Sequence, residues 1–223
     1  MDITKAIRNR ISIRGFKSDP VSKKILREIL ETAGRAPSAL NTQPWEFTVI
    51  AGDILNTIRR EIVEKLNSGV PAEPEHIVSG WPKDSVYRQR QVTLAKQIFR
   101  LMDIKREDTK KRAWWLERGF RFFDAPAAII ITTDRILTES TPLMDIGAVM
   151  QSICLAALDR GLGTCIEDQG VMYPEVLRNF AGIPESRKII IAIAIGYPDP
   201  DFPANRLDAK REPVDSITQW IGF

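Results

Sequence analysis

Two segments of this chain are almost unbroken runs of apolar residues of strand length. Ala127 to Thr133 reads Ala-Ala-Ile-Ile-Ile-Thr-Thr, and Lys188 to Ile195 reads Lys-Ile-Ile-Ile-Ala-Ile-Ala-Ile. A strand with one wet face alternates apolar and polar residues, whereas a strand covered on both faces does not. The chain therefore has to place helices on both sides of a sheet, which predicts a three-layer α+β domain.

The remaining elements follow from apolar periodicity. Further strands are expected in Glu46 to Ala51 and in Leu162 to Asp168. The helix expected from Leu143 to Arg160 is apolar on more than one face, which indicates deep burial or a subunit interface. Other helices are expected at four places: Asp2 to Arg10, Val21 to Arg35, Ile54 to Asn67 and Pro174 to Phe180.

The composition of the chain argues against several classes of function. The 223 residues suit a single domain, 1–223, and a net charge of +3 is too balanced to indicate nucleic acid binding. Two cysteines, Cys154 and Cys165, and a lone His76 give no disulfide framework, no metal spacing and no Ser-His-Asp scheme. No apolar run approaches the ~20 residues of a membrane span, and no secretory signal is visible. We expect a cytoplasmic protein without a metal.

A stiff polar bend, Pro37-Ser38-Ala39-Leu40-Asn41-Thr42-Gln43-Pro44-Trp45, joins a helix to a strand. The two prolines restrict the backbone and leave N–H groups without internal partners. Ser38, Asn41 and Gln43 can hydrogen-bond to the edge of a planar heteroaromatic ligand, and Trp45 can anchor the bend in the core. A plain helix-to-strand turn explains the same residues equally well.

Polar and apolar residues alternate in the strand expected from Arg10 to Phe16. Arg10, Ser12 and Arg14 share one side of an extended backbone. Two guanidiniums and a hydroxyl that face one way form a good phosphate clamp, because arginine offers planar, permanently charged donors. The alternative is an edge strand with a solvated polar face.

Two long segments lie outside the predicted core. Residues 70–118 hold aromatic side chains among charged ones, which is typical of a lid, although two solvated surface helices would look the same. The tail, residues 197–223, contains four prolines but ends in Trp220, Ile221 and Phe223. We expect this tail to wrap over a neighbouring surface, such as a second copy of the chain.

Four motifs together resemble the nitroreductase family of FMN enzymes, in family order and spacing over nearly the whole chain. They are Arg10-Ile11-Ser12-Ile13-Arg14, the bend from Pro37 to Trp45, Gly161-Leu162-Gly163-Thr164-Cys165, and the tail from Gly196-Tyr197-Pro198 to Arg211-Glu212-Pro213. Within the family, the long tail and Phe122-Phe123-Asp124-Ala125-Pro126 are most similar to the nitrobenzoate-reductase branch. The resemblance implies a mixed, mostly antiparallel sheet flanked by helices, and a homodimer with two FMN sites at its interface.

The resemblance also implies roles for individual residues. Arg10, Ile11 and Ser12 would lie at the FMN phosphate and ribityl chain, with Arg14 at the N1/O2 edge of the flavin. Arg211 would add a second phosphate contact. The remaining cofactor contacts would come from Pro37, Ser38, Ala39 and Asn41 of the other subunit, from Arg121 at the N1/O2 edge, and from the backbone of Ile166, Glu167 and Asp168 near flavin N5.

The implied activity is ping-pong hydride transfer, from NADPH or NADH to FMN and then to a nitroaromatic, quinone or similar electron-poor acceptor. It needs no catalytic side chain, because flavin N5 carries the chemistry. Lid residues Trp81, Tyr87, Trp114 and Trp115 would contact the acceptor, and Arg88 or Arg90 could pair with a substrate carboxylate. The alternatives are a reductive dehalogenase or deiodinase, an ene-reductase on the same scaffold, or a flavin-binding protein without turnover.

Overall fold

A four-stranded antiparallel sheet forms the middle layer of the structure, a computed structural model that describes residues 2–76, 80–138 and 140–223. Its strands lie in the order β1-β2-β4-β3, and each neighbouring pair runs antiparallel. The strands are β1 (Glu46–Ala51), β2 (Ala127–Asp134), β3 (Gly163–Glu167) and β4 (Arg187–Gly196). All four were predicted from the sequence. Among the described residues, one isolated bridge is parallel, and it joins Ser12 to Thr164.

The two faces of the sheet belong to two different hydrophobic cores. Along β2, Ile129 and Ile131 pack into one core, whereas Ala128 and Ile130 pack into the other. Successive strand side chains point to opposite faces, so an unbroken apolar run is what a doubly covered strand requires. All four side chains are fully buried. The three-layer architecture inferred from these runs is therefore confirmed.

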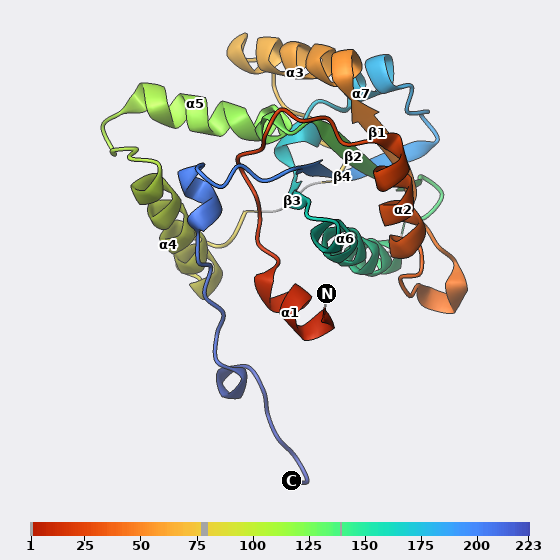
Figure 1. The fold of residues 1–223 in the computed structure, drawn as a ribbon, viewed down its shortest axis with the longest axis vertical. Helices are drawn as coiled ribbons and strands as arrows, with labels where there is room; N and C mark the ends of the chain where they lie inside the picture. The colour runs from red at the N-terminus through yellow and green to blue at the C-terminus, as the bar shows by residue number, and fades with distance from the viewer. Residues whose placement is uncertain (1, 77–79, 139) are drawn as a thin grey trace.

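Helices cover both faces (Figure 1). On one face lie α2 (Lys23–Ala33) and α6 (Thr141–Asp159), and on the other lie α3 (Gly52–Asn67) and α7 (Pro174–Ala181). The Ser22 hydroxyl caps α2 by accepting from the Ile25 N–H at 3.3 Å. Gly161 follows the end of α6 with φ +73°, a conformation that glycine adopts without strain.

One described helix, α6, is long and apolar enough to cross a membrane by length and composition. It packs against α2, and Ile146, Val149 and Ile153 lie in a hydrophobic core of the domain. A core helix passes the same test, and these contacts account for the buried side of α6, which is 39% of the apolar window.

The segment after α1 (Ile3–Asn9) is extended but is not the regular strand expected from Arg10 to Phe16. It touches the sheet at two isolated bridges, Ser12 with Thr164 and Phe16 with Pro198. Continuous pairing is interrupted because the backbone of Arg14 and Gly15 bonds to the Asn205 side chain instead. The predicted alternation still holds, since Ile13 is buried and Arg14 is only half-buried.

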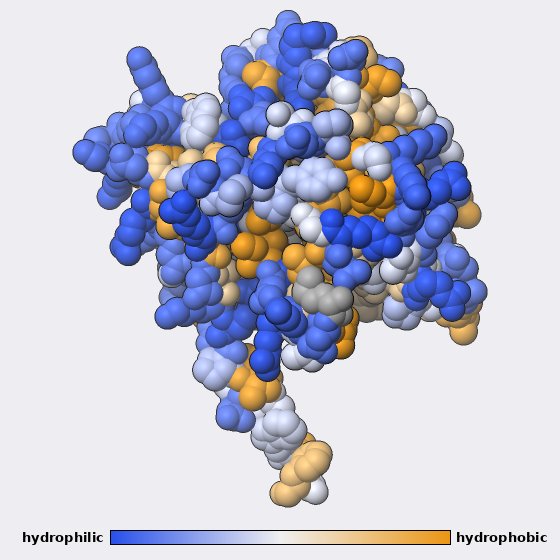
Figure 2. Space-filling view, viewed as in Figure 1, coloured by the Kyte–Doolittle hydropathy of each residue, from blue (hydrophilic) through white to orange (hydrophobic). Residues whose placement is uncertain are grey.

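A pair of helices, α4 (Val86–Leu101) and α5 (Thr109–Phe120), lies to one side of the sandwich (Figure 1). They belong to the segment expected to form a lid, of which residues 77–79 lie outside the described part. The tail passes α4 through η4 (Pro203–Arg206), continues through η5 (Val214–Ser216), and ends away from the body. Figure 2, drawn in the same view as Figure 1, shows apolar side chains gathered in the middle of the visible surface and again along the tail.

Three further single turns connect these elements: η1 (Ala39–Asn41), η2 (Phe122–Asp124) and η3 (Gln169–Val171). In η2, all three residues have positive φ, at 55°, 51° and 58°. In η1, Leu40 and Asn41 have φ of 51° and 60°. Left-handed backbone costs an L-residue roughly 1–2 kcal/mol, so tertiary contacts must hold both turns in place.

Candidate functional site

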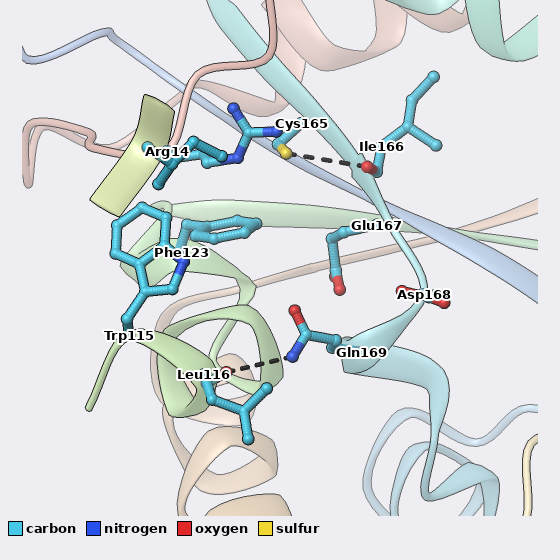
Figure 3. Close-up of a pocket in the computed structure, with 10 residues that line it drawn as sticks. Arg14, Trp115, Leu116, Phe123, Cys165, Ile166, Glu167, Asp168 and Gln169 are labelled. Carbon is cyan, nitrogen blue, oxygen red and sulfur yellow. Dashed lines mark hydrogen bonds between the residues drawn. The ribbon is translucent and has the colours of Figure 1, made fainter. Parts of the chain in front are cut away.

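Two cavities that share Arg14 form the candidate site. One has a volume of about 250 Å³ and lies between the end of β3 and the helices α4 and α5 (Figure 3). The other has a volume of about 550 Å³ and lies between α1, the segment from Arg10 to Arg14, and the tail. Arg14 lines both cavities, so the two adjoin at this side chain.

The larger cavity is strongly basic. Four guanidiniums line it, together with the hydroxyl-bearing Ser12 and the carboxylate of Asp208. The arginines are Arg8, Arg10, Arg14 and Arg211. The alternation correctly predicted that Arg10, Ser12 and Arg14 lie together. Arg211 joins them, although it follows Arg14 by 197 residues in the sequence. Such a set of charged, planar donors suits a phosphate group.

The backbone at Arg14 is held by the tail. The Asn205 Oδ1 accepts from the N–H groups of Arg14 at 2.7 Å and Gly15 at 3.1 Å, while its Nδ2 donates to the Gly15 carbonyl at 2.8 Å. Phe202 packs directly on Gly15, where an added Cβ would lie 2.0 Å from Cγ of the ring. The tail therefore positions the residue that both cavities share.

The end of β3 and the turn after it supply one wall of the smaller cavity. Cys165, Ile166, Glu167 and Asp168 all line it. Burial raises the pKa of the Cys165 thiol to about 12, so this group stays protonated and unreactive. Figure 3 shows the Glu167 carboxyl directed toward the interior beneath the strand, near the Gln169 side chain.

Glu167 is buried, and its surroundings favour the neutral acid. Its Oε2 accepts from the Gly170 N–H at 2.7 Å, while its Oε1 has no hydrogen-bond partner in the described part of the chain. Burial raises the pKa of Glu167 to about 8, and the nearby Asp168 contributes in the same direction. Near pH 7 this turn therefore carries less negative charge than its two acidic residues suggest.

The opposite wall of the smaller cavity comes from the helical excursion and η2. Four apolar side chains line it: Ile98, Trp115, Leu116 and Phe123. Gln169 closes the rim, and its Nε2 donates to the Leu116 carbonyl at 3.2 Å. A cavity with one apolar wall and a polar backbone turn opposite suits a planar heteroaromatic ring.

The polar bend lies apart from both cavities. The Ala39 N–H donates to the Asp145 carboxylate at 3.2 Å, and the Gln43 N–H donates to Ser38 Oγ at 3.0 Å. Leu40 is fully exposed at its tip. In Figure 1 this bend is separated from α1 by α6. The predicted contacts of Pro37, Ser38, Ala39 and Asn41 with a cofactor remain a prediction that concerns a second subunit.

The residues predicted for the lid are distributed over several places. Trp81 and Tyr87 lie with ring centroids 5.3 Å apart and line a third cavity of about 800 Å³ between α4 and residues 209–212 of the tail. This cavity adjoins the basic one, because Leu94, Ala209 and Arg211 line both. Arg90 pairs there with Glu212 at 3.1 Å. Arg88 donates to Gln91 Oε1 at 2.6 Å and lines another groove. Their substrate contacts remain a prediction.

Arg121 contacts Asp124, with Nε 2.8 Å from Oδ1, and also pairs with Glu117. Hydrogen bonding to Asp124 raises the pKa of Arg121, as expected for a guanidinium held by carboxylates. Neither of the two described cavities is lined by Arg121. Trp114 packs under the guanidinium of Arg118, whereas its neighbour Trp115 reaches the smaller cavity.

Several residues of this site were not foreseen as site residues. They are Arg8, Ile98, Leu116, Arg118, Phe123, Gln169 and Asn205. Arg8 could have been found, because it is a basic residue only two positions before Arg10. The others carry no local pattern, since they reach the site through contacts between distant segments. Together, the two cavities can hold an elongated ligand with an anionic end and a flat aromatic end.

Comparison with known proteins gives concordant results. The sequence profile of the nitroreductase family matches residues 7–197. The chain is 34% identical to the nitrobenzene nitroreductase of Ectopseudomonas oleovorans over 218 residues, which cover 96% of this chain and 95% of that protein. It is 30% identical to the 4-nitrobenzoate reductase of Pseudomonas putida over 224 residues, covering 100% and 96%. An FMN- and NADPH-dependent nitroreductase, NfnB from Sphigopyxis sp. strain HMH, superposes with a TM-score of 0.94 at 27% identity and full coverage of both chains.

Proposed function

The chain belongs to the nitroreductase family, and from this premise we propose that it is an FMN-dependent oxidoreductase that uses NAD(P)H to reduce nitroaromatic acceptors. The observation that carries the proposal is the pair of cavities that meet at Arg14, one basic and one with an aromatic and aliphatic wall opposite a polar one. FMN has this polarity, with a phosphate at one end and an isoalloxazine ring at the other. The chemistry of the donors present therefore fits the cofactor.

The residues that would hold FMN follow from the two cavities. Arg10 and Arg211, helped by Arg8, would hold the phosphate, and Ser12 would contact the ribityl chain. Arg14 would lie at the N1/O2 edge, where a positive charge favours electron transfer into the ring. The backbone of the turn at Ile166, Glu167 and Asp168 would face the opposite edge, near N5.

When bound, FMN supplies hydride transfer, from NAD(P)H to N5 and then, in a separate half-reaction, to the acceptor. The chain contributes binding, orientation and electrostatics. Trp115, Leu116 and Phe123 line the smaller cavity, where they would favour a flat acceptor and limit the access of water. A neutral Glu167 keeps an extra negative charge away from the reduced ring.

We further propose that the working unit is a cytoplasmic homodimer. The end of the tail exposes Trp220, Ile221 and Phe223, whose relative accessibilities are 60%, 76% and 101%. Leu40 at the tip of the polar bend is equally exposed. Exposed apolar residues of this size are typical of surfaces that another chain covers. A second copy would bring the bend to the neighbouring flavin.

The test begins with the colour of the purified protein. We expect a yellow preparation that NADPH bleaches under anaerobic conditions and that a nitroarene then recolours. The double variant Arg10→Ala with Arg211→Ala should lose FMN during gel filtration, because both guanidiniums line the phosphate cavity. Its matched control is Arg88→Ala with Arg106→Ala, two arginines that line a different groove. Equal flavin retention in both variants would contradict the proposed site.

The colour assay, together with assays of two other substrates, separates the alternatives. A flavin that NAD(P)H cannot reduce indicates a binding protein without turnover, and a colourless protein rejects the flavin site altogether. Release of iodide from iodotyrosine by the reduced protein, in preference to nitroarene reduction, would favour a deiodinase. Reduction of an activated alkene in preference to both would favour an ene-reductase.

A further inference from the structure

We propose that Arg118 is a positioning residue that fixes Arg14 against the flavin and thereby links α5 to the cofactor. This inference rests on the proposed function, because it assigns a role to Arg118 within the same site. Arg118 carries no sequence motif, and it lies 104 residues from Arg14 along the chain. The geometry around its guanidinium carries the inference.

The guanidinium of Arg118 joins three segments. Its Nη2 donates to the Arg14 carbonyl at 2.9 Å and to the Phe123 carbonyl at 3.2 Å. Its Nη1 donates to Asp124 Oδ2 at 2.7 Å. Arg14 and Phe123 both line the smaller cavity, so a single side chain fixes the backbone of two residues that would contact the flavin.

The position of Arg14 depends on this contact. On its N–H side, the Arg14 backbone is bonded to Asn205, and on its carbonyl side it is bonded to Arg118. These two bonds leave the main chain little freedom to rotate. The Arg14 side chain, which serves both cavities, starts from that fixed backbone, and its Nη1 donates to the Ser12 carbonyl at 3.3 Å.

Arg118 also holds η2, the left-handed turn. Three successive residues with positive φ are costly, and the turn persists because its carbonyls are bonded from outside. Arg118 binds the Phe123 carbonyl, while Arg59 donates to the Arg121 carbonyl at 2.9 Å and also to that of Ala125. Loosening Arg118 therefore releases Phe123 and Arg14 together.

The rest of the Arg118 environment connects the helix to the tail. The guanidinium lies between two aromatic rings, 5.3 Å from the centroid of Trp114 and 4.8 Å from that of Phe202. Phe202 in turn packs on Gly15, next to Arg14. A shift of α5, whose Trp115 lines the smaller cavity, is thus transmitted to the arginine at the flavin edge.

Burying the charged guanidinium of Arg118 costs free energy, which is unexpected for a residue that serves stability alone. Arg118 is only 8% exposed, its Nε has no hydrogen-bond partner among the described residues, and burial lowers its pKa. Removing one partner of a buried ion pair is costly when the other charge stays buried and unpaired. Here the Asp124 side chain is 41% exposed and keeps its pairing with Arg121 at 2.8 Å. We therefore expect Arg118→Met to retain a folded apoprotein and yet to bind FMN less tightly.

The test is a double-mutant cycle on FMN affinity, measured by quenching of flavin fluorescence with apoprotein. Arg118→Met should weaken FMN binding by about tenfold, the effect of losing one charge-assisted hydrogen bond. In an Arg14→Ala background the same change should cost less than about twofold, because the group that Arg118 positions is already gone. In an Arg211→Ala background its full tenfold effect should remain.

Arg112→Met is the matched control, since Arg112 lies on the same helix and contacts the Arg106 carbonyl and the Phe99 ring. It should leave FMN affinity unchanged. The midpoint potential of the bound flavin gives a second readout, which Arg118→Met should lower and Arg112→Met should not. If Arg118→Met prevents folding, Arg118→Lys, which keeps the charge but not the fork of donors, replaces it in the same cycle.

The outcomes are distinct. If the wild-type apoprotein does not bind FMN, both the proposed function and this inference fall. If FMN binds and Arg14→Ala weakens it, but Arg118→Met has no effect or has the same effect in every background, the proposed function stands and this inference is wrong. Coupling confined to the Arg14 background supports it.

Discussion

Replacing Glu167 by glutamine tests the most unusual electrostatic feature of the site. Glutamine has the shape of the protonated acid, so Glu167→Gln keeps the packing and removes only the capacity to ionise. The wild-type carboxyl is buried at the end of β3, with one oxygen bonded to the Gly170 N–H and the other without a partner in the described chain.

The magnitude follows from proton linkage. The pKa of Glu167 is about 8 in the folded protein against an ordinary value of 4.5, mainly because of burial. The folded state therefore holds a proton that the unfolded state releases between those two pH values. The stabilisation is complete below pH 4.5 and is lost as pH rises through about 8. A gap of about 3.5 units at ~1.4 kcal/mol each corresponds to at most about 5 kcal/mol.

Urea denaturation of the flavin-free protein at a series of pH values from 5 to 9, at fixed protein concentration, measures this effect. The free energy of unfolding of the wild type should fall with rising pH by several kcal/mol more than that of Glu167→Gln. Asp168→Asn is the control, because that neighbouring carboxylate is only half-buried and should leave most of the slope in place. Parallel pH profiles for wild type and Glu167→Gln would refute the argument that burial keeps this acid neutral.

Three further predictions concern the framework of the site. Gly15→Ala should destabilise the fold by about 1–3 kcal/mol in urea and weaken FMN binding, because its Cβ would lie 2.4 Å from the Phe202 Cβ. Glu75→Gln should cost about 1–3 kcal/mol by thermal or urea unfolding, since Glu75 accepts from Arg178 and from the Ile189 N–H at 2.7 Å. Burial alone would raise the pKa of Glu75, but these bonds lower it overall, so its stabilising effect should disappear as pH falls below about 4.5. Truncation after Ser216 should leave the circular dichroism spectrum intact but shift sedimentation toward monomer, because it removes the exposed apolar end of the tail. A truncated protein that sediments like the full chain would contradict the proposed role of the tail.

The sequence was sufficient for features that depend on local periodicity. The strand predicted from Lys188 to Ile195 is found as Arg187–Gly196, and the strand predicted from Glu46 to Ala51 is found with those limits. The common orientation of Arg10, Ser12 and Arg14 also follows from two-residue alternation, which a chain adopts whenever it is extended. These properties need only the backbone and the nearest neighbours.

Tertiary structure decided what surrounds those elements. Asn205 replaces regular strand pairing at Arg14 from 191 residues away, and Arg118 approaches the same residue from 104 residues away. No periodicity relates such positions, because their contact is created only when the helices and the tail pack on the sheet. The charge state of Glu167 has the same origin, since a carboxyl becomes a neutral acid only where the folded chain has removed water around it. Sequence alone determined that Arg10, Ser12 and Arg14 share one side of the chain. Packing determined which other residues join them, how firmly they are held and with what charge.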